Sequence, residues 1–168
     1  MTTTSAGTPT LMQLPKRANS RLYTLKQLKR AGLPDKDLLV FYTTVIRPVI
    51  EYASVVWHHS ITAAQSDRLE ALQKRAMRII SPVVYDMPYH IALLFLNLES
   101  LHQRRTNQGI KFFNSLCHPE NCLNHLLPPK RETHHISRLR HARTYPTPRT
   151  RTKCYCSFIQ FALTNYQL

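Results

Sequence analysis

The sequence predicts an all-α fold: a small helical bundle followed by a basic, largely irregular C-terminal extension. Between residues 16 and 117, apolar residues recur at the three- to four-residue spacing of amphipathic helices. Beyond residue 118, five prolines interrupt the chain, and histidines and arginines stand between them. With 168 residues, the chain is long enough for one modest domain with a hydrophobic core.

These patterns divide the chain into four segments. Residues 1–15 lack the charged and apolar parts of a signal peptide, and we interpret them as a disordered leader or a remnant of gene truncation. Residues 16–117 are predicted to form the bundle, and residues 118–157 a basic region of loops rich in proline, histidine and arginine. Residues 158–168 regain an apolar pattern, which predicts a short C-terminal helix that packs back on the fold.

The first helix is expected at about residues 16–31. Gly32 is a natural stop just beyond its end. One face carries Tyr23, Lys26 and Arg30. The opposite face is an apolar stripe that consists of Ala18, Leu22, Leu25 and Leu28.

The second helix is expected from Asp35 or Asp37, either of which can cap it, to about Trp57. It is apolar on most faces, which is typical of the buried centre of a bundle. Pro48 stands in its middle and removes one backbone hydrogen bond, so a kink is expected there. The β-branched run VIRPVIEYASVVW also allows an extended strand, and this alternative stays open.

The third helix is expected to begin after the capping box Thr62-x-x-Gln65 and to run to about Ile80. Its buried stripe is predicted to be Leu69, Leu72, Ala76, Ile79 and Ile80. Two further apolar patterns predict helices at about 88–96 and 100–117.

The charge balance points to a polyanionic partner. The chain has 23 Lys and Arg residues against 9 Asp and Glu residues, a formal net charge of +14. Residues 1–34 and 133–168 contain no acidic residue, so both ends are basic arms. Such an excess suits nucleic acid or an anionic membrane surface. Because no apolar run approaches the ~20 residues of a membrane span, we expect nucleic acid and no membrane.

We expect neither a catalytic centre nor a cofactor. Nucleotidyl transfer needs clustered carboxylates that hold two divalent metal ions. The only close pair of aspartates is Asp35 and Asp37, which suit the positive N-terminal end of a helix. The three glycines have no spacing that cradles a phosphate.

Cysteines and histidines leave one weak hypothesis of a metal site. Cys117, Cys122 and His125 fall within nine residues, but structural zinc usually needs two separate pairs of ligands. We therefore predict no metal and keep these three residues as weak candidates for zinc. The four cysteines are irregularly spaced and fit a reducing compartment, so an intracellular location, cytoplasmic or nuclear, is expected.

Basic residues at helical spacing form the candidate site. Tyr23 can stack on a base while neighbouring cations contact phosphates. The alternative is that these faces are only solvated, since Glu70 and other neighbours can pair with Lys74 and Arg78 at helical spacing. The candidate nucleic-acid-binding residues are Tyr23, Lys26, Arg30, Lys74, Arg78, Arg104 and Arg105.

Five segments occur in an order that carries a resemblance to a known family. They are RANSRLYTLKQLKRAG, YTTVIRPVIEYASVVWH, LEALQKRAMRII, LNLESLHQRR and an arginine-rich stretch that precedes Ser-Phe-Ile near the C-terminus. Together they resemble the region behind the polymerase palm in reverse transcriptases of non-LTR (LINE-type) retrotransposons, especially the jockey-like groups.

The resemblance implies a thumb-like bundle that grips a primer–template duplex, followed by a basic extension. None of the matched segments belongs to the palm, so the chain is expected to be a fragment without a polymerase active site. The expected partners are the backbone of RNA or of an RNA/DNA duplex, bound without sequence preference, and the missing palm and fingers of the parent polymerase. The alternative is a helical structural or protein-interaction remnant with no independent activity.

Overall fold

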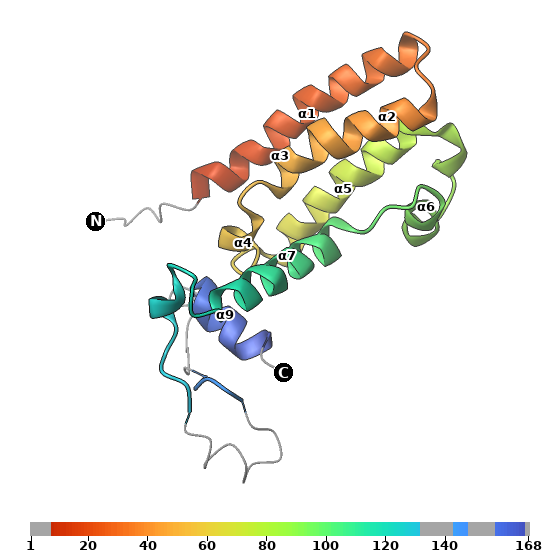
Figure 1. The fold of residues 1–168 in the computed structure, drawn as a ribbon. Helices are drawn as coiled ribbons and strands as arrows, with labels where there is room; N and C mark the ends of the chain where they lie inside the picture. The colour runs from red at the N-terminus through yellow and green to blue at the C-terminus, as the bar shows by residue number, and fades with distance from the viewer. Residues whose placement is uncertain (1–7, 132–142, 148–156, 167–168) are drawn as a thin grey trace. The chain divides into compact units, whose positions relative to one another are not determined.

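The computed structural model describes residues 8–131, 143–147 and 157–166 (Figure 1). Every regular element among these residues is helical, which confirms the all-α prediction and excludes the strand alternative. The chain divides into two compact units, described separately below. The first comprises Met1–Ala53 and Ile61–Arg104, and the second Ser54–Ser60 and Arg105–Leu168. The division at Arg104 therefore falls within the segment that the sequence assigned to one bundle.

Helix α1 (Thr8–Arg30) begins earlier than predicted, because residues 8–15 form its first turns instead of a leader. Pro9 lies in the first turn, where a helix tolerates proline. The predicted end is observed. Gly32 takes a left-handed φ of +87°, and the amide of Leu33 donates to the carbonyl of Leu28 at 3.3 Å.

The second predicted helix is broken into α2 (Asp35–Phe41), a π-helical turn (Tyr42–Ile46) and α3 (Arg47–Glu51). The π-helical turn ends two residues before Pro48, which has no amide hydrogen to continue the regular ladder. A kink was expected at this proline, and the structure has instead a wider π-helical turn, which contains one residue more than an α-helical turn.

Both ends of this helix differ from the prediction. Pro34 occupies the N-cap position, so neither Asp35 nor Asp37 caps the helix with its side chain. At the other end the helix stops at Glu51, before Ala53 takes a left-handed φ of +51°. The expected continuation to residue 57 is therefore wrong.

Helix α5 (Ala63–Ile80) begins as predicted. The hydroxyl of Thr62 accepts from the amide of Gln65 at 3.2 Å, and the side-chain oxygen of Gln65 accepts from the amide of Thr62 at 2.9 Å. This reciprocal pair confirms the capping box.

Helix α1 packs against α5 and against α2 and α3, which makes a three-helix bundle (Figure 1). Its core is formed by Ala18, Leu22, Leu25, Leu38, Tyr42, Ile46, Ile50, Leu69, Leu72, Ala76, Met77 and Ile80. The expectation that the second helix is the buried centre is wrong, because α1 packs against both other helices of the bundle, whereas the second predicted helix makes few contacts with α5. The second helix leaves Val40, Thr44 and Pro48 exposed to solvent.

A 3₁₀ turn (Pro82–Val84) and helix α6 (Tyr89–Phe95) follow α5. A small apolar cluster holds this segment, and its buried members are Met77, Val84, Ala92 and Leu96. Buried Tyr42 donates to the side chain of Gln73 at 2.9 Å, and Gln73 donates to the carbonyl of Glu99 at 2.8 Å. Burial raises the pKa of the Tyr42 hydroxyl, so it stays protonated in this network.

The second unit contains α4 (Ser54–Trp57), α7 (Leu101–Leu116) from Arg105 onward, and α9 (Phe158–Asn165). A second capping box, in which Ser157 and Gln160 bond reciprocally, begins α9. The buried core of the second unit consists of Phe113, Tyr145, Ala162 and Leu163. Gly109 allows Tyr166 to approach α7, because a Cβ there would lie 2.8 Å from the tyrosine hydroxyl.

Candidate nucleic-acid interface

A basic groove with a volume of about 480 Å³ lies between α1 and α5 in the first unit. Helix α1 contributes polar, aromatic and cationic side chains, and α5 contributes two arginines. A second tyrosine comes from the segment just beyond the 3₁₀ turn. The polar and aromatic residues that line this α1–α5 groove are Asn19, Tyr23, Lys26, Arg75, Arg78 and Tyr85.

The packing of α1 fixes the direction of its groove residues. Leu22 and Leu25 are buried in the bundle. Tyr23 and Lys26 each follow one of these leucines, so the 100° turn between helical neighbours carries them to the exposed side. The same stripe that holds the bundle together therefore presents the groove.

Helix α5 presents its arginines in the same way. Ala76 and Met77 are buried, and Arg75 and Arg78 on either side of them are exposed. Arg75 and Arg78 are three residues apart, which places them on one face of the helix.

Two contacts inside the groove hold the arginines in place. The guanidinium of Arg75 donates across the groove to the side-chain oxygen of Asn19 at 3.5 Å. The guanidinium carbon of Arg78 lies 4.8 Å from the ring centroid of Tyr85, a cation–π arrangement. Neither contact neutralises the charge.

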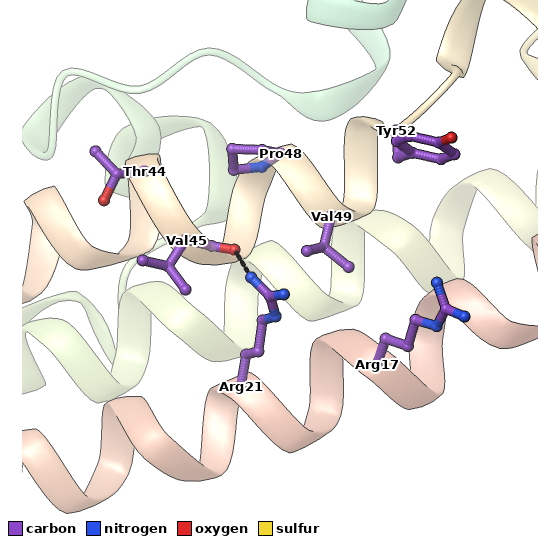
Figure 2. Close-up of a pocket in the computed structure, with 7 residues that line it drawn as sticks. All are labelled: Arg17, Arg21, Thr44, Val45, Pro48, Val49 and Tyr52. Atoms are coloured by element: carbon purple, nitrogen blue, oxygen red, sulfur yellow. Dashed lines mark hydrogen bonds between the residues drawn. The ribbon is translucent and has the colours of Figure 1, made fainter.

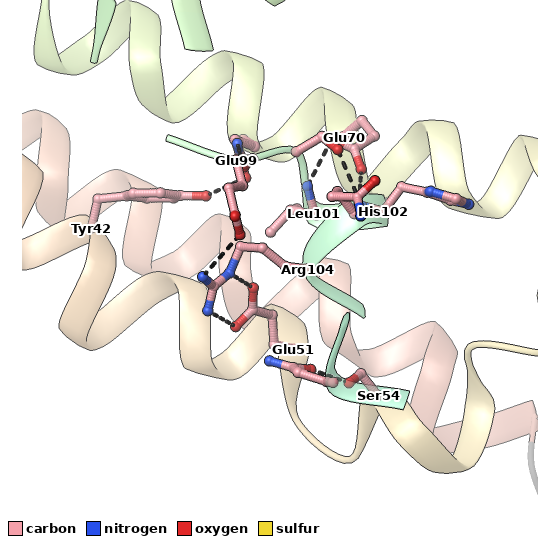
Figure 3. A network of polar contacts seen from close by, with 12 residues as sticks. Tyr42, Glu51, Ser54, Glu70, Glu99, Leu101, His102 and Arg104 are labelled. Atoms are coloured by element: carbon pink, nitrogen blue, oxygen red, sulfur yellow. Dashed lines mark hydrogen bonds and ion pairs between the residues drawn. The ribbon is translucent and has the colours of Figure 1, made fainter. Parts of the chain in front are cut away.

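The three groove cations, Lys26, Arg75 and Arg78, form no ion pair with any residue that the structure describes. Among the described residues, no ion pair joins Glu70 to Lys74 or Arg78, the two cations for which the alternative interpretation proposed it as one partner. The Glu70 carboxylate accepts from the backbone amides of Leu101 at 3.2 Å and His102 at 2.6 Å, and so caps the start of α7 (Figure 3).

The other cations of α1 and α5 whose side chains the structure describes lie outside the groove lining. Arg30 and Lys74, both predicted site residues, are exposed. Lys29 instead has a structural role: its ammonium donates to Asp35 at 2.5 Å and to the carbonyl of Ile80 at 2.9 Å. Ile80 is the last residue of α5, so this cation stabilises the negative end of that helix.

Arg104, a predicted site residue, is engaged within the first unit. Figure 3 shows its guanidinium in a two-pronged pair with the carboxylate of Glu51, at 2.5 and 3.2 Å, and near Glu99 at 3.6 Å. The bond to Glu51 raises the pKa of Arg104, which keeps it charged. Arg104 therefore links the start of α7 to the end of α3, and its guanidinium, predicted to contact a phosphate, is instead engaged by carboxylates of the protein.

Arg105, the second member of the predicted doublet, has no exposed surface. Its guanidinium carbon lies 5.8 Å from the ring centroid of Trp57, itself a buried residue of the second unit. The expected contact with a nucleic-acid backbone is incompatible with this burial. Neither member of the doublet therefore belongs to the candidate interface.

A smaller groove of about 310 Å³ lies on the other flank of α1, toward the π-helical turn and α3 (Figure 2). Arg17 and Arg21 line it, with Tyr52 at one end. Arg21 donates to the backbone carbonyl of Val45 at 2.7 Å. Cations thus flank both sides of α1.

The weak metal hypothesis finds no assembled site. The described residues contain no group of three or more histidine, cysteine, aspartate or glutamate side chains placed to hold a metal ion. A ring nitrogen of His125 lies 2.8 Å from the backbone carbonyl of Cys122, and Cys117 and Cys122 are free thiols. Cys154 and Cys156 lie outside the described residues.

Sequence reasoning missed Arg75 and Tyr85 as site residues. Arg75 had a signal, because it precedes Arg78 by three residues on the same helix. Tyr85 had none, since it reaches the groove only through the path of the chain after Pro82. The burial of Arg105 also had a signal: it continues the four-residue spacing of Leu101, Gly109 and Phe113, which are buried.

No protein-family model matches this chain. The comparisons with curated proteins and with solved structures found no significant match. Within the described part of the chain, no helix combines the length and the apolar character that crossing a membrane requires.

Proposed function

We propose that this chain binds nucleic acid through the α1–α5 groove, mainly by contacts to the phosphate backbone. One observation carries the proposal: Lys26, Arg75 and Arg78 converge from two helices on one groove, and none is paired with a described acid. Convergent cations that lack protein counter-ions are what a polyanion needs. The net charge of +14 adds a long-range attraction for the same class of partner.

The proposed origin of the chain is the post-palm region of a non-LTR retrotransposon reverse transcriptase. The five segments that resemble this family support it, and the three-helix bundle is compatible with a thumb. The proposed role is to hold a nucleic-acid backbone while polymerase chemistry takes place on palm and fingers supplied by another part of the parent enzyme. The chain alone is proposed to extend no primer.

Salt dependence of binding tests the proposal directly. The affinity of the full chain for a 20-base-pair duplex should fall linearly on a log–log plot as salt rises, with a slope of about −0.9 per phosphate neutralised. Contact by the three groove cations corresponds to about three units of that slope. Undetectable binding at low salt, or an affinity that does not respond to salt, would contradict the proposal.

One observation favours a second candidate, a protein-interaction module. Helix α6 exposes Ile91, Leu94 and Phe95, with Leu94 79% accessible. Contiguous exposed apolar side chains are typical of protein contact sites. Under this hypothesis, a Leu94→Glu variant loses binding to palm and fingers of a jockey-like reverse transcriptase, whereas Val40→Glu, on the exposed side of α2, keeps it.

A further inference from the structure

We propose that the α1–α5 groove accepts an unpaired nucleotide, with its base against the ring of Tyr23 or Tyr85 and its phosphates on Lys26 and Arg75. The inference rests on the proposed function and names the form of nucleic acid that the groove selects. The ligand is a single strand, or an unpaired stretch, of RNA or DNA.

The exposure of the two tyrosines is the first observation. Tyr23 is 65% exposed and Tyr85 is 61% exposed. They come from different elements, yet both line one groove together with three cations. Aromatic rings that leave the core and stand beside cations make the stacking platforms on which single strands bind.

The contact between Arg78 and Tyr85 is the second observation. With the guanidinium 4.8 Å from the ring centroid, Arg78 covers part of one face of Tyr85 and orients the ring. A platform that is held before binding loses less conformational entropy when the base arrives. Arg78 also keeps its positive charge at the edge of the platform, where a phosphate of the same strand can lie.

The geometry of the groove favours an unpaired strand over a duplex for stacking, although a duplex can still contact the groove cations through its phosphates. In a duplex each base is covered on both faces by its neighbours, so the tyrosines would have no ring to stack on unless the helix opened. A volume of about 480 Å³ falls within the range of sites that hold one small organic group. The groove therefore matches one unpaired nucleotide with its flanking phosphates, whereas a double helix can meet its cations only through backbone phosphates at the rim.

The test compares three probes of equal strand length: a 12-nucleotide thymidine strand, the same backbone with abasic positions, and a duplex. Phosphates are common to all three, so the ratio of affinities for the thymidine and abasic strands isolates stacking. The wild-type chain should bind the thymidine strand about 5- to 150-fold more tightly than the abasic strand. A uridine strand measured in parallel shows whether the groove prefers RNA or DNA. A ratio of about 5 to 150 over the abasic strand, for either the uridine or the thymidine strand, supports the proposal.

Substitutions of the tyrosines test whether the ratio of affinities for the thymidine and abasic strands depends on the groove. Tyr23→Ala combined with Tyr85→Ala should reduce the ratio to about 1, because only the thymidine strand has bases that can stack on the two rings. Tyr85→Phe should keep the ratio, because it retains the ring. Tyr52→Ala is the matched control, since Tyr52 is equally exposed at 66% and lies outside the groove.

Failure of this inference is distinguishable from failure of the proposed function. If all three probes bind with equal affinity and the tyrosine variants change nothing, stacking is refuted while backbone binding stands. If the double variant weakens binding to all three probes alike, the tyrosines support the fold and the inference is wrong. If no probe binds at low salt, the proposed function fails as well.

Discussion

Arg78 on α5 and Arg105 on α7 look equivalent in the sequence, where each lies in a basic cluster on an amphipathic helix, but they have opposite environments. Arg78 is exposed and lines the α1–α5 groove, 4.8 Å from the Tyr85 ring. Arg105 has no exposed surface and lies 5.8 Å from the Trp57 ring. An aromatic ring accompanies both arginines, so the ring alone does not identify a binding residue.

Solvent access separates the two roles. A buried guanidinium contributes through its contacts and would have to leave the protein to meet a phosphate. An exposed guanidinium contributes little to folding but keeps its charge for a ligand. Two expectations follow for this chain. Substituting a groove cation should change the affinity for nucleic acid but not the free energy of unfolding. Substituting a buried or paired charged residue should change the free energy of unfolding but not the affinity.

The largest expected effect is on stability, at Arg105. Arg105→Ala removes a fully buried side chain and should lower the free energy of unfolding by about 2–4 kcal/mol. Arg78→Ala should lower it by less than about 1 kcal/mol, because only an exposed cation–π contact is lost. Urea denaturation followed by circular dichroism measures both.

Arg105→Met, which keeps most of the buried volume, tests the same comparison in binding. A folded Arg105→Met protein should have the salt slope of the wild type. A slope that flattens by about one unit would mean that Arg105 contacts a phosphate, and the second expectation would not hold.

A smaller effect is expected at Glu70, which caps α7 by accepting from two backbone amides. Glu70→Gln should lower the unfolding free energy by about 1–2 kcal/mol, because a charged acceptor at a helix N-terminus is lost. Glu120→Gln, an exposed glutamate beyond the end of α7, should change it by less than about 0.5 kcal/mol.

The same Glu70 variant also tests the alternative interpretation of the basic faces. If Glu70 neutralised Arg78 or Lys74, its removal would strengthen binding of nucleic acid. We expect the affinity of Glu70→Gln for a duplex to equal that of the wild type, and a clear increase would show that the groove cations are partly paired.

The smallest effect is expected at the pair of Lys29 and Asp35. The hydrogen bond from Lys29 holds the pKa of the Asp35 carboxyl below its usual value. Because the folded-state pKa is depressed, the stabilisation is present above the unfolded pKa of about 4 and is lost as pH falls through the folded pKa. Asp35 is half exposed, so Asp35→Asn should cost less than about 0.5 kcal/mol at pH 7 and nothing at pH 2. Thermal unfolding at the two pH values measures the difference, and an equal cost at both would exclude an electrostatic origin.

Local signals in the sequence predicted the elements that depend on neighbours in the chain. The capping box at Thr62 and the left-handed glycine at residue 32 are examples, since a few adjacent residues decide each. The apolar stripe of α1 predicted Ala18, Leu22 and Leu25 as core residues for the same reason.

Features that depend on tertiary structure were not predictable in this way. The early stop at Glu51 requires Ala53 to take a left-handed conformation, which nothing in its own side chain favours. The approach of Tyr85 to α1 depends on the path of the chain after α5. Charge alone suggested both arginine clusters, and separating the exposed Arg78 from the buried Arg105 requires the position of each arginine relative to the apolar stripe of its helix.

The most direct test of the account compares two double variants drawn from the same two helices. Lys26→Gln with Arg78→Gln removes two charges from the α1–α5 groove. Arg30→Gln with Lys74→Gln removes two charges that are also exposed but lie outside its lining. The pairs match in charge, in helix of origin and in chemical change, so position is the variable.

The quantity to measure is the log–log salt slope for a 20-base-pair duplex, with circular dichroism to verify that each variant is folded. The account predicts that the groove pair flattens the slope by up to about two units and that the outside pair leaves it nearly unchanged. Equal slopes for the two variants, or a larger change in the outside pair, would contradict the assignment of the binding site to the groove.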